Sequence, residues 1–348
     1  MTEQAEKQEQ DVAESVSPEA SNADSALPDI QPPNAGFILQ LFLIPMMIVT
    51  VIIGVWLLFN FISRDESPTE LVRGLQKMNN ASWQKAYTLS SMLRNPSSAD
   101  LKNDEALAGE LIAILNTELT PETTDENQIK LRIFVCKCLG EFEIDAGMPA
   151  LLQAAQQSRN EHELAIALTA VESLAVLIQN LGPDSLDQHG DPGTTLIAIS
   201  NAPSENPDYT LRVNQIRSAA GYALGVLGTE AAKGRLESML KDAYPNARFN
   251  AAVGLARHGN LKSTPVLLEM LDPDNAAVVQ GEPEGSYGFK RSVVMINAIR
   301  GVDRLAEFHS PEELKPLLDA LKSLDDGENI DSETRLIAKD AVRKITTK

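Results

Sequence analysis

The sequence predicts an all-α protein: an α-solenoid of about six to seven helical hairpins, preceded by a disordered tail and one transmembrane helix. Three observations predict this fold class. Residues 37–62 form one uncharged apolar run. The chain beyond it repeats apolar residues at helical spacing. One helical pattern recurs after 31 residues. We therefore divide the chain into a tail (1–36), a transmembrane helix (37–62) and a solenoid domain (63–348).

The tail, residues 1–36, carries eight acids, one lysine and no aromatic residue. A segment of this composition buries too little apolar surface to offset the entropy lost on ordering. We therefore expect the tail to be disordered.

The apolar run of residues 37–62 is 26 residues long and carries no charged side chain. As a helix it would be about 39 Å long, which exceeds the ~30 Å hydrocarbon layer of a bilayer. The acids before it are not typical of a cleaved signal peptide, which begins with positive charge. We expect an uncleaved single-pass membrane anchor.

The sidedness of this anchor follows from the basic residues near it. Within about 20 residues of the run, Lys and Arg occur only on the C-terminal side, at Arg64, Arg73 and Lys77. The positive-inside rule then predicts that the C-terminal domain is cytoplasmic and that the tail lies outside.

Beyond the anchor, apolar residues recur at i, i+3, i+4 and i+7, and β-type alternation is scarce. Residues 67–70 form a capping box with proline at the first helical position, and Asp104 and Asp145 are further candidate caps. The predicted helices are 68–79, 83–94, 105–117, 127–141, 146–157, 161–181, 194–200, 209–227, 230–241, 246–258, 261–271, 289–305, 311–324 and 332–346.

Two of these helices repeat the same pattern. Arg217, Ala220, Leu224 and Gly228 align with Arg248, Ala251, Leu255 and Gly259. The small residues let neighbouring helices pack closely, the leucine fills the space between them, and the final glycine permits a left-handed cap. A single hairpin of this kind leaves an apolar side exposed, so that hairpins must stack. We therefore expect Leu224 and Leu255 to be buried.

The pattern R-x-x-A-[AG]-x-[AG]-L-x-x-x-G at 217–228 and 248–259 resembles the second helix of a HEAT repeat. It is especially similar to the short bacterial HEAT-like repeats first noted in phycobilin lyases. The resemblance is specific over 209–275 and looser over 68–205 and 289–346. It implies an α-solenoid in which Arg217 and Arg248 are structural and pair with acids of a turn. For Arg248 these acids would be Asp272 or Asp274.

Residues that carry chemistry are scarce. One HEAT-type enzyme class, the deoxyhypusine hydroxylases, binds two irons through several His-Glu pairs, whereas this chain has one such pair, His162-Glu163. Cys136 and Cys138 would point to different faces of a helix, which favours core packing over a redox pair. The acidic balance, 49 acids against 30 basic residues, argues against a nucleic-acid ligand. We expect no catalytic residue, metal or cofactor.

The turns within the predicted hairpins share one edge of the solenoid, and several of them are long and acidic. Long insertions on one edge often mark a binding face, although acidic loops can also be simply solvated in a chain of net charge −19. The candidate acidic edge, which would bind a basic protein partner, comprises Glu122, Asp125, Glu126, Asp274, Glu282, Glu284, Asp325, Asp326, Glu328 and Asp331. The groove lined by the second helices is the competing face.

These observations favour a membrane-anchored scaffold or adaptor that binds an unidentified protein through its solenoid and is not an enzyme. The alternative is a HEAT-like repeat enzyme of the lyase type, or one that handles a chromophore or another ligand. The two hypotheses differ in the site they need. A lyase needs a deep apolar pocket with a few polar groups, whereas a scaffold needs only a shallow groove.

Overall fold

The computed structural model of the 348-residue chain describes residues 35–62, 67–77, 81–117, 125–182, 191–204, 206–325, 327 and 330–347. The chain falls into two compact units, Met1–Asp65 and Glu66–Lys348. Within the described residues every regular element is a helix, which confirms the all-α class. The expected disordered tail lies outside the described residues, except for Ala35 and Gly36, which belong to the first helix.

The first unit contains α1 (Ala35–Ile62), a helix of 28 residues that includes Pro45. The hydroxyl of Thr50 donates to the carbonyl of Met46 at 2.8 Å. The stretch Leu41–Leu58 has a mean hydropathy of 2.7, and none of it is buried. The second helix that is long and apolar enough to cross a membrane, Glu161–Leu181, is 61% buried and is a core helix of the second unit.

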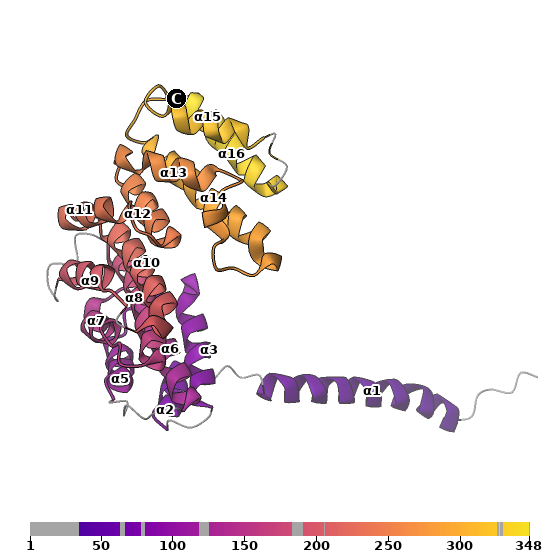
Figure 1. Ribbon diagram of the computed structural model, residues 1–348. Coiled ribbons are helices and arrows are strands. Elements are labelled where there is room, and N and C mark those ends of the chain that lie inside the picture. The colour runs from indigo at the N-terminus through magenta and orange to yellow at the C-terminus, as the bar shows by residue number, and fades with distance from the viewer. Residues whose placement is uncertain are drawn as a thin grey trace, which may run out of the picture. The chain divides into compact units, whose positions relative to one another are not determined.

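The second unit is a series of helical hairpins, seven of them within the described residues (Figure 1). The short helix α4 (Ala99–Lys102) lies between the first and second hairpins. The hairpins are α2 (Pro68–Leu75) with α3 (Ser82–Arg94), α5 (Glu105–Leu115) with α6 (Glu126–Gly140), α7 (Met148–Ala155) with α8 (Glu161–Leu181), α9 (Pro192–Asn201) with α10 (Thr210–Leu227), α11 (Glu230–Met239) with α12 (Pro245–Arg257), α13 (Thr264–Leu271) with α14 (Tyr287–Leu305), and α15 (Lys315–Ser323) with α16 (Ser332–Thr346).

The second helices of the hairpins stack in one continuous row, in which α3, α6, α8, α10, α12, α14 and α16 each contact the next. The first helices pack against this row, each on its own partner (Figure 1). This stacking of hairpins is that of an α-solenoid.

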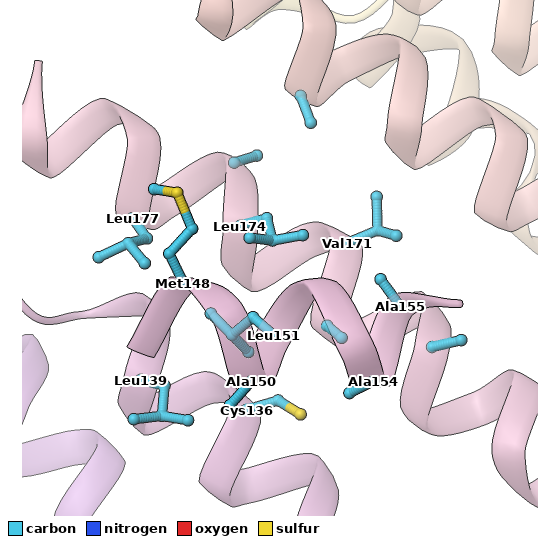
Figure 2. Packing of buried hydrophobic residues seen from close by; sticks show 14 of the residues in the cluster. Cys136, Leu139, Met148, Ala150, Leu151, Ala154, Ala155, Val171, Leu174 and Leu177 are labelled. Carbon is cyan, nitrogen blue, oxygen red and sulfur yellow. The ribbon is translucent and has the colours of Figure 1, made fainter. Parts of the chain in front are cut away.

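The core fills the space between the helices of successive hairpins. Figure 2 shows Met148 and Leu151 of α7 meeting Leu174 of α8 and Leu139 of α6, all of them at most 1% exposed. The buried residues form two clusters, one reaching from α2 to α12 and the other from α12 to α16. Helix α12 contributes to both, with Leu255 in the first and Phe249 in the second.

Two histidines that the sequence left without a role join successive second helices. His258, which follows α12, lies with its Nε2 2.9 Å from the carbonyl oxygen of Gly225 in α10. His309, which follows α14, repeats this contact at 2.7 Å from the carbonyl oxygen of Gly259. These side chains therefore hold the ends of neighbouring hairpins together.

Candidate functional site

The two repeat arginines are engaged in ion pairs between helices. Arg217 donates from Nε and Nη2 to the two carboxylate oxygens of Asp242, each at 2.9 Å, and Asp242 lies in the turn after α11. Arg248 pairs with Glu269 of α13, and not with the expected turn acids Asp272 and Asp274. Both arginines are only 17% exposed, so they brace the hairpins and are not available to a ligand.

The candidate acidic edge is only partly within the described residues, since Glu122, Asp326 and Glu328 lie outside them. Several of its other members serve the fold. Asp125 and Asp331 are the N-caps of α6 and α16. Three members form ion pairs: Glu126 with Lys130, Glu282 with Lys290, and Asp325 with Lys339. Asp274 and Glu284 are exposed. A basic partner for this edge stays a prediction.

Asp331 is the most strongly held carboxylate of this edge. Its partial burial acts to raise its pKa, but hydrogen bonds from the hydroxyls of Ser292 and Thr334 and from the backbone amide of Thr334 outweigh that effect. The pKa of Asp331 is consequently lowered to about 2. This side chain joins α14 to the start of α16.

A polar groove runs along the exposed face of the second helices. Its main cavity, of about 930 Å³, lies over α10, α12 and α14, and an adjoining cavity of about 540 Å³ extends over α8. Tyr222, Asn246, Asn250 and Lys290 line both cavities, so the two form one groove across four helices. The lining of the groove is more polar than apolar, which differs from the apolar pocket that a lyase-type site would need.

The groove is rich in arginine, although the chain has a net charge of −19. Arg257, Arg300 and Arg304 line the main cavity, and Arg212 lines the adjoining one. Arg304 pairs with Glu307 at 2.9 Å. Among the described residues, no acid lies within ion-pair distance of Arg212, Arg257 or Arg300.

Other polar groups complete the groove. The guanidinium of Arg257 lies over the ring of Tyr222, 5.7 Å from its centroid. Asn250 donates to the backbone and the hydroxyl of Ser218, which joins α12 to α10. Desolvation raises the pKa of the Glu172 carboxyl in the adjoining cavity, although Lys137 and Arg212 act to lower it. The groove thus offers hydrogen-bond donors and groups of both charges to a ligand, since Glu172, Glu282, Asp303 and Glu307 line it as well.

The described residues bring no metal-binding group together. No three His, Cys, Asp or Glu side chains among them are placed to hold a metal ion. The Glu163 carboxylate is bonded to Arg159. Cys136 and Cys138 are free and fully buried, and burial raises the pKa of the Cys136 thiol to about 12. Such a thiol stays protonated, so these cysteines act as core residues.

Comparison with known proteins identifies the type of helical repeat. Residues 213–282, from α10 to the turn after α13, match the family of HEAT repeats. The match and the stacked hairpins together support HEAT repeats in this part of the chain. No curated protein matches the chain. A solved structure of human deoxyhypusine hydroxylase in complex with glycerol is similar at 17% identity and a TM-score of 0.31, covering 81% of this chain and 97% of that one.

This comparison corrects the expectation of a non-catalytic scaffold that is not an enzyme. The similar structure is that of an enzyme, which points away from the expected absence of catalysis. At this identity and TM-score the likeness assigns no reaction to the chain.

Proposed function

We propose that this HEAT-repeat protein handles an anionic ligand, which it binds in the groove over α8, α10, α12 and α14. One observation carries the proposal. Arg257 and Arg300 line a cavity in which basic residues outnumber the acids Asp303 and Glu307, and neither arginine lies within ion-pair distance of an acid among the described residues. Arginine is suited to such a role, because its planar guanidinium matches carboxylate and phosphate oxygens in pairs.

The spacing of the arginines on α14 adds to this argument. Arg300 and Arg304 are four residues apart, and like charges at this spacing repel, although the ion pair of Arg304 with Glu307 offsets part of the repulsion. Arg257 and Arg304 lie in the last turns of their helices, where the helix dipole favours a cation. Arg300 lies more than a turn before the end of α14, so the dipole does not account for it. An anion in the cavity would offset the repulsion.

The test uses the full chain in lipid nanodiscs and citrate as the probe, with binding measured by titration calorimetry. We expect citrate to bind, and Arg300→Gln to weaken the affinity at least threefold. Arg94→Gln is the matched control, since Arg94 lies on α3, away from both cavities. Affinity should also fall with added salt, because exposed charges are screened. Equal citrate affinity in the native chain and in Arg300→Gln would contradict the proposal.

We further propose that α1 is a single-pass membrane anchor with the HEAT-repeat unit on the cytoplasmic side. The length of α1, about 42 Å, and the apolar stretch Leu41–Leu58 support the span. Arg64, Arg73 and Lys77, all C-terminal to α1, support the sidedness. A reporter enzyme that works only in the cytoplasm should be active when it is fused after Lys348. A reporter that works only outside the cell should be inactive at the same position. Activity of a reporter that works only outside the cell would overturn the sidedness.

A further inference from the structure

An aromatic cluster lies on the surface of the first two hairpins. The rings of Trp83 and Tyr87 in α3 each lie against the ring of Phe134 in α6, with centroids 6.2 Å and 5.4 Å apart. Tyr87 is 54% exposed, and Trp83 and Phe134 are half-buried. Single exposed apolar side chains are ordinary, but three rings in contact at a surface indicate a site of interaction.

Two ammonium groups accompany these rings. The Nζ atoms of Lys130 and Lys137 lie 5.9 Å and 5.1 Å from the centroids of Trp83 and Phe134. Tryptophan and tyrosine combine an apolar body with a polar tip, and lysine carries its charge at the end of an apolar stem. Side chains of this kind are enriched where the hydrocarbon of a membrane meets water.

Acids also lie beside the aromatic cluster, so its local charge is balanced. Glu126 pairs with Lys130, and Glu172 of α8 is close enough to Lys137 for the lysine to act on its pKa. The surface is therefore suited to a layer of lipid headgroups, which presents both charges, and its rings supply the apolar contact.

The first hairpin differs in charge from the rest of the chain. Residues 67–98 carry four basic residues and one acid, whereas the whole chain has a net charge of −19. The basic residues are Arg73, Lys77, Lys85 and Arg94. Arg73 and Lys77 are exposed, and Arg94 pairs with Glu141. Because anionic lipids attract basic segments and repel acidic ones, this hairpin is the part of the solenoid best suited to a membrane surface.

The chain itself keeps this hairpin close to the proposed membrane anchor. Six peptide bonds join Ile62, the last residue of α1, to Pro68, the first of α2. Even fully extended, such a link spans at most about 20 Å. The apolar stretch Leu41–Leu58 ends only about 6 Å before Ile62 along the helix. If α1 spans the bilayer, α2 thus begins within reach of the headgroups.

We propose that the first two hairpins dock on the headgroup layer of the membrane through Trp83, Tyr87 and Phe134. Lys130 and Lys137 lie among the headgroups, and the positive charge of the first hairpin favours anionic lipids. This inference rests on the proposed membrane anchor α1. Docking would fix the orientation of the solenoid on the bilayer, which the short link alone leaves free.

The test uses tryptophan fluorescence, because the chain has two tryptophans, Trp56 in α1 and Trp83. The full chain is placed in nanodiscs of phosphatidylcholine and phosphatidylserine, with or without a nitroxide near the top of the lipid acyl chains. In Trp56→Phe, only Trp83 reports, and we expect the nitroxide to quench it at least twofold. Discs without phosphatidylserine should quench it less, and equal quenching in both discs would contradict the role of charge.

A distant tryptophan provides the first control. Phe308 follows α14 and is 58% exposed, so Phe308→Trp is added to a chain that also carries Trp56→Phe and Trp83→Phe. This tryptophan should keep nearly all its fluorescence. Equal quenching at positions 83 and 308 would overturn docking through the aromatic cluster.

A matched pair of variants tests the cluster itself. In the Trp56→Phe chain, Tyr87→Ser should reduce the quenching of Trp83 at least twofold, because it removes the most exposed ring. Leu211→Ser, at a position 59% exposed on α10, should leave it unchanged. Quenching that is indifferent to Tyr87→Ser would overturn the inference.

The Trp83→Phe chain separates this inference from the proposed anchor, because only Trp56 then reports. If Trp56 is quenched and Trp83 is not, the anchor stands and the docking falls. If neither tryptophan is quenched, both proposals fall.

Discussion

Gly225 of α10 and Gly254 of α12 meet backbone to backbone. A Cβ atom on Gly225 would lie 2.6 Å from the Cα of Gly254, and one on Gly254 would lie 2.8 Å from the Cα of Gly225. The nearest atom opposite each position belongs to the main chain, so it cannot move away as the end of a flexible side chain could. The two helices thus cross at the closest approach that their main chains allow.

Substitution of Gly225 by alanine should force α10 and α12 apart. We expect Gly225→Ala to lower the free energy of unfolding by about 1–3 kcal/mol, the range for overpacked cores. Gly234→Ala is the control, because a Cβ at Gly234 of α11 meets nothing within 4 Å. There alanine should stabilise the helix by about 0.5–1 kcal/mol. Urea unfolding of the full chain in nanodiscs, followed by circular dichroism, measures both. Equal effects of the two variants would show that the crossing is not tight.

Truncation of Leu224 tests the packing between hairpins. Leu224 is fully buried, and Leu224→Ala should cost about 2–5 kcal/mol through lost burial and the cavity left behind. Leu211 lies on the same helix and is 59% exposed, so Leu211→Ala should change stability by less than about 0.5 kcal/mol. An unchanged melting temperature for Leu224→Ala would show that the repeat alignment is wrong.

The ion pair of Arg217 with Asp242 should contribute far more than pairs on the surface. Its side chains are 17% and 11% exposed, and removing one partner leaves a nearly buried charge. Arg217→Ala should therefore cost about 3–5 kcal/mol. The pair of Arg343 with Asp340 is 75% and 39% exposed, and Arg343→Ala should cost at most about 1 kcal/mol. Chemical unfolding compares the two variants, and similar losses would contradict this reasoning.

The lowered pKa of Asp331 makes stability depend on acid pH. Its folded-state pKa is about 2, below the ordinary value of 3.8, so its ionised form stabilises the fold above about pH 4. That contribution is lost as pH falls from about 4 toward 2. The native chain should thus be more stable than Asp331→Asn at pH 5, and the difference should shrink at pH 2–3.

Ser292→Ala provides an independent check that the pH dependence of stability arises from the lowered pKa of Asp331. It removes the hydroxyl that donates to Asp331, so the pKa of Asp331 should rise and the stabilisation should be lost at a higher pH. Thermal unfolding over this pH range measures both variants. A difference between the native chain and Asp331→Asn that does not change with pH would rule out the carboxylate as its source.

The repeat pattern was sufficient to predict the hairpins, because it depends on the spacing of small and apolar residues along each helix. That spacing can be seen in a single sequence. Leu224 and Leu255 are fully buried, and Arg217 pairs with a turn acid, Asp242. The partner of Arg248 could not be predicted in the same way. Glu269 lies about one helical turn before the expected acids, and Asp272 instead accepts from the amide of Asp274 in its own turn.

The turn between α13 and α14 shows a second limit of local patterns. Its acidic residues placed it in the candidate acidic edge, yet Val278 and Val279 within it are buried in the core. The groove shows a third. Arg212, Arg257 and Arg300 come from three helices, and the stacking of α10, α12 and α14 brings them to one surface.

Helix α12 belongs to both clusters of buried residues, and this has a consequence for cooperativity. In a solenoid each hairpin is stabilised only by its neighbours, so the clusters on either side of α12 can lose structure as separate units. A ligand in the proposed groove would contact α8 and α10 on one side and α14 on the other. Its binding energy would be lost when either side opens, so it would couple the two halves into a single unfolding transition. Occupancy of the groove would then be reported by slower amide exchange in α16 and α6 alike, far from any residue that the ligand touches.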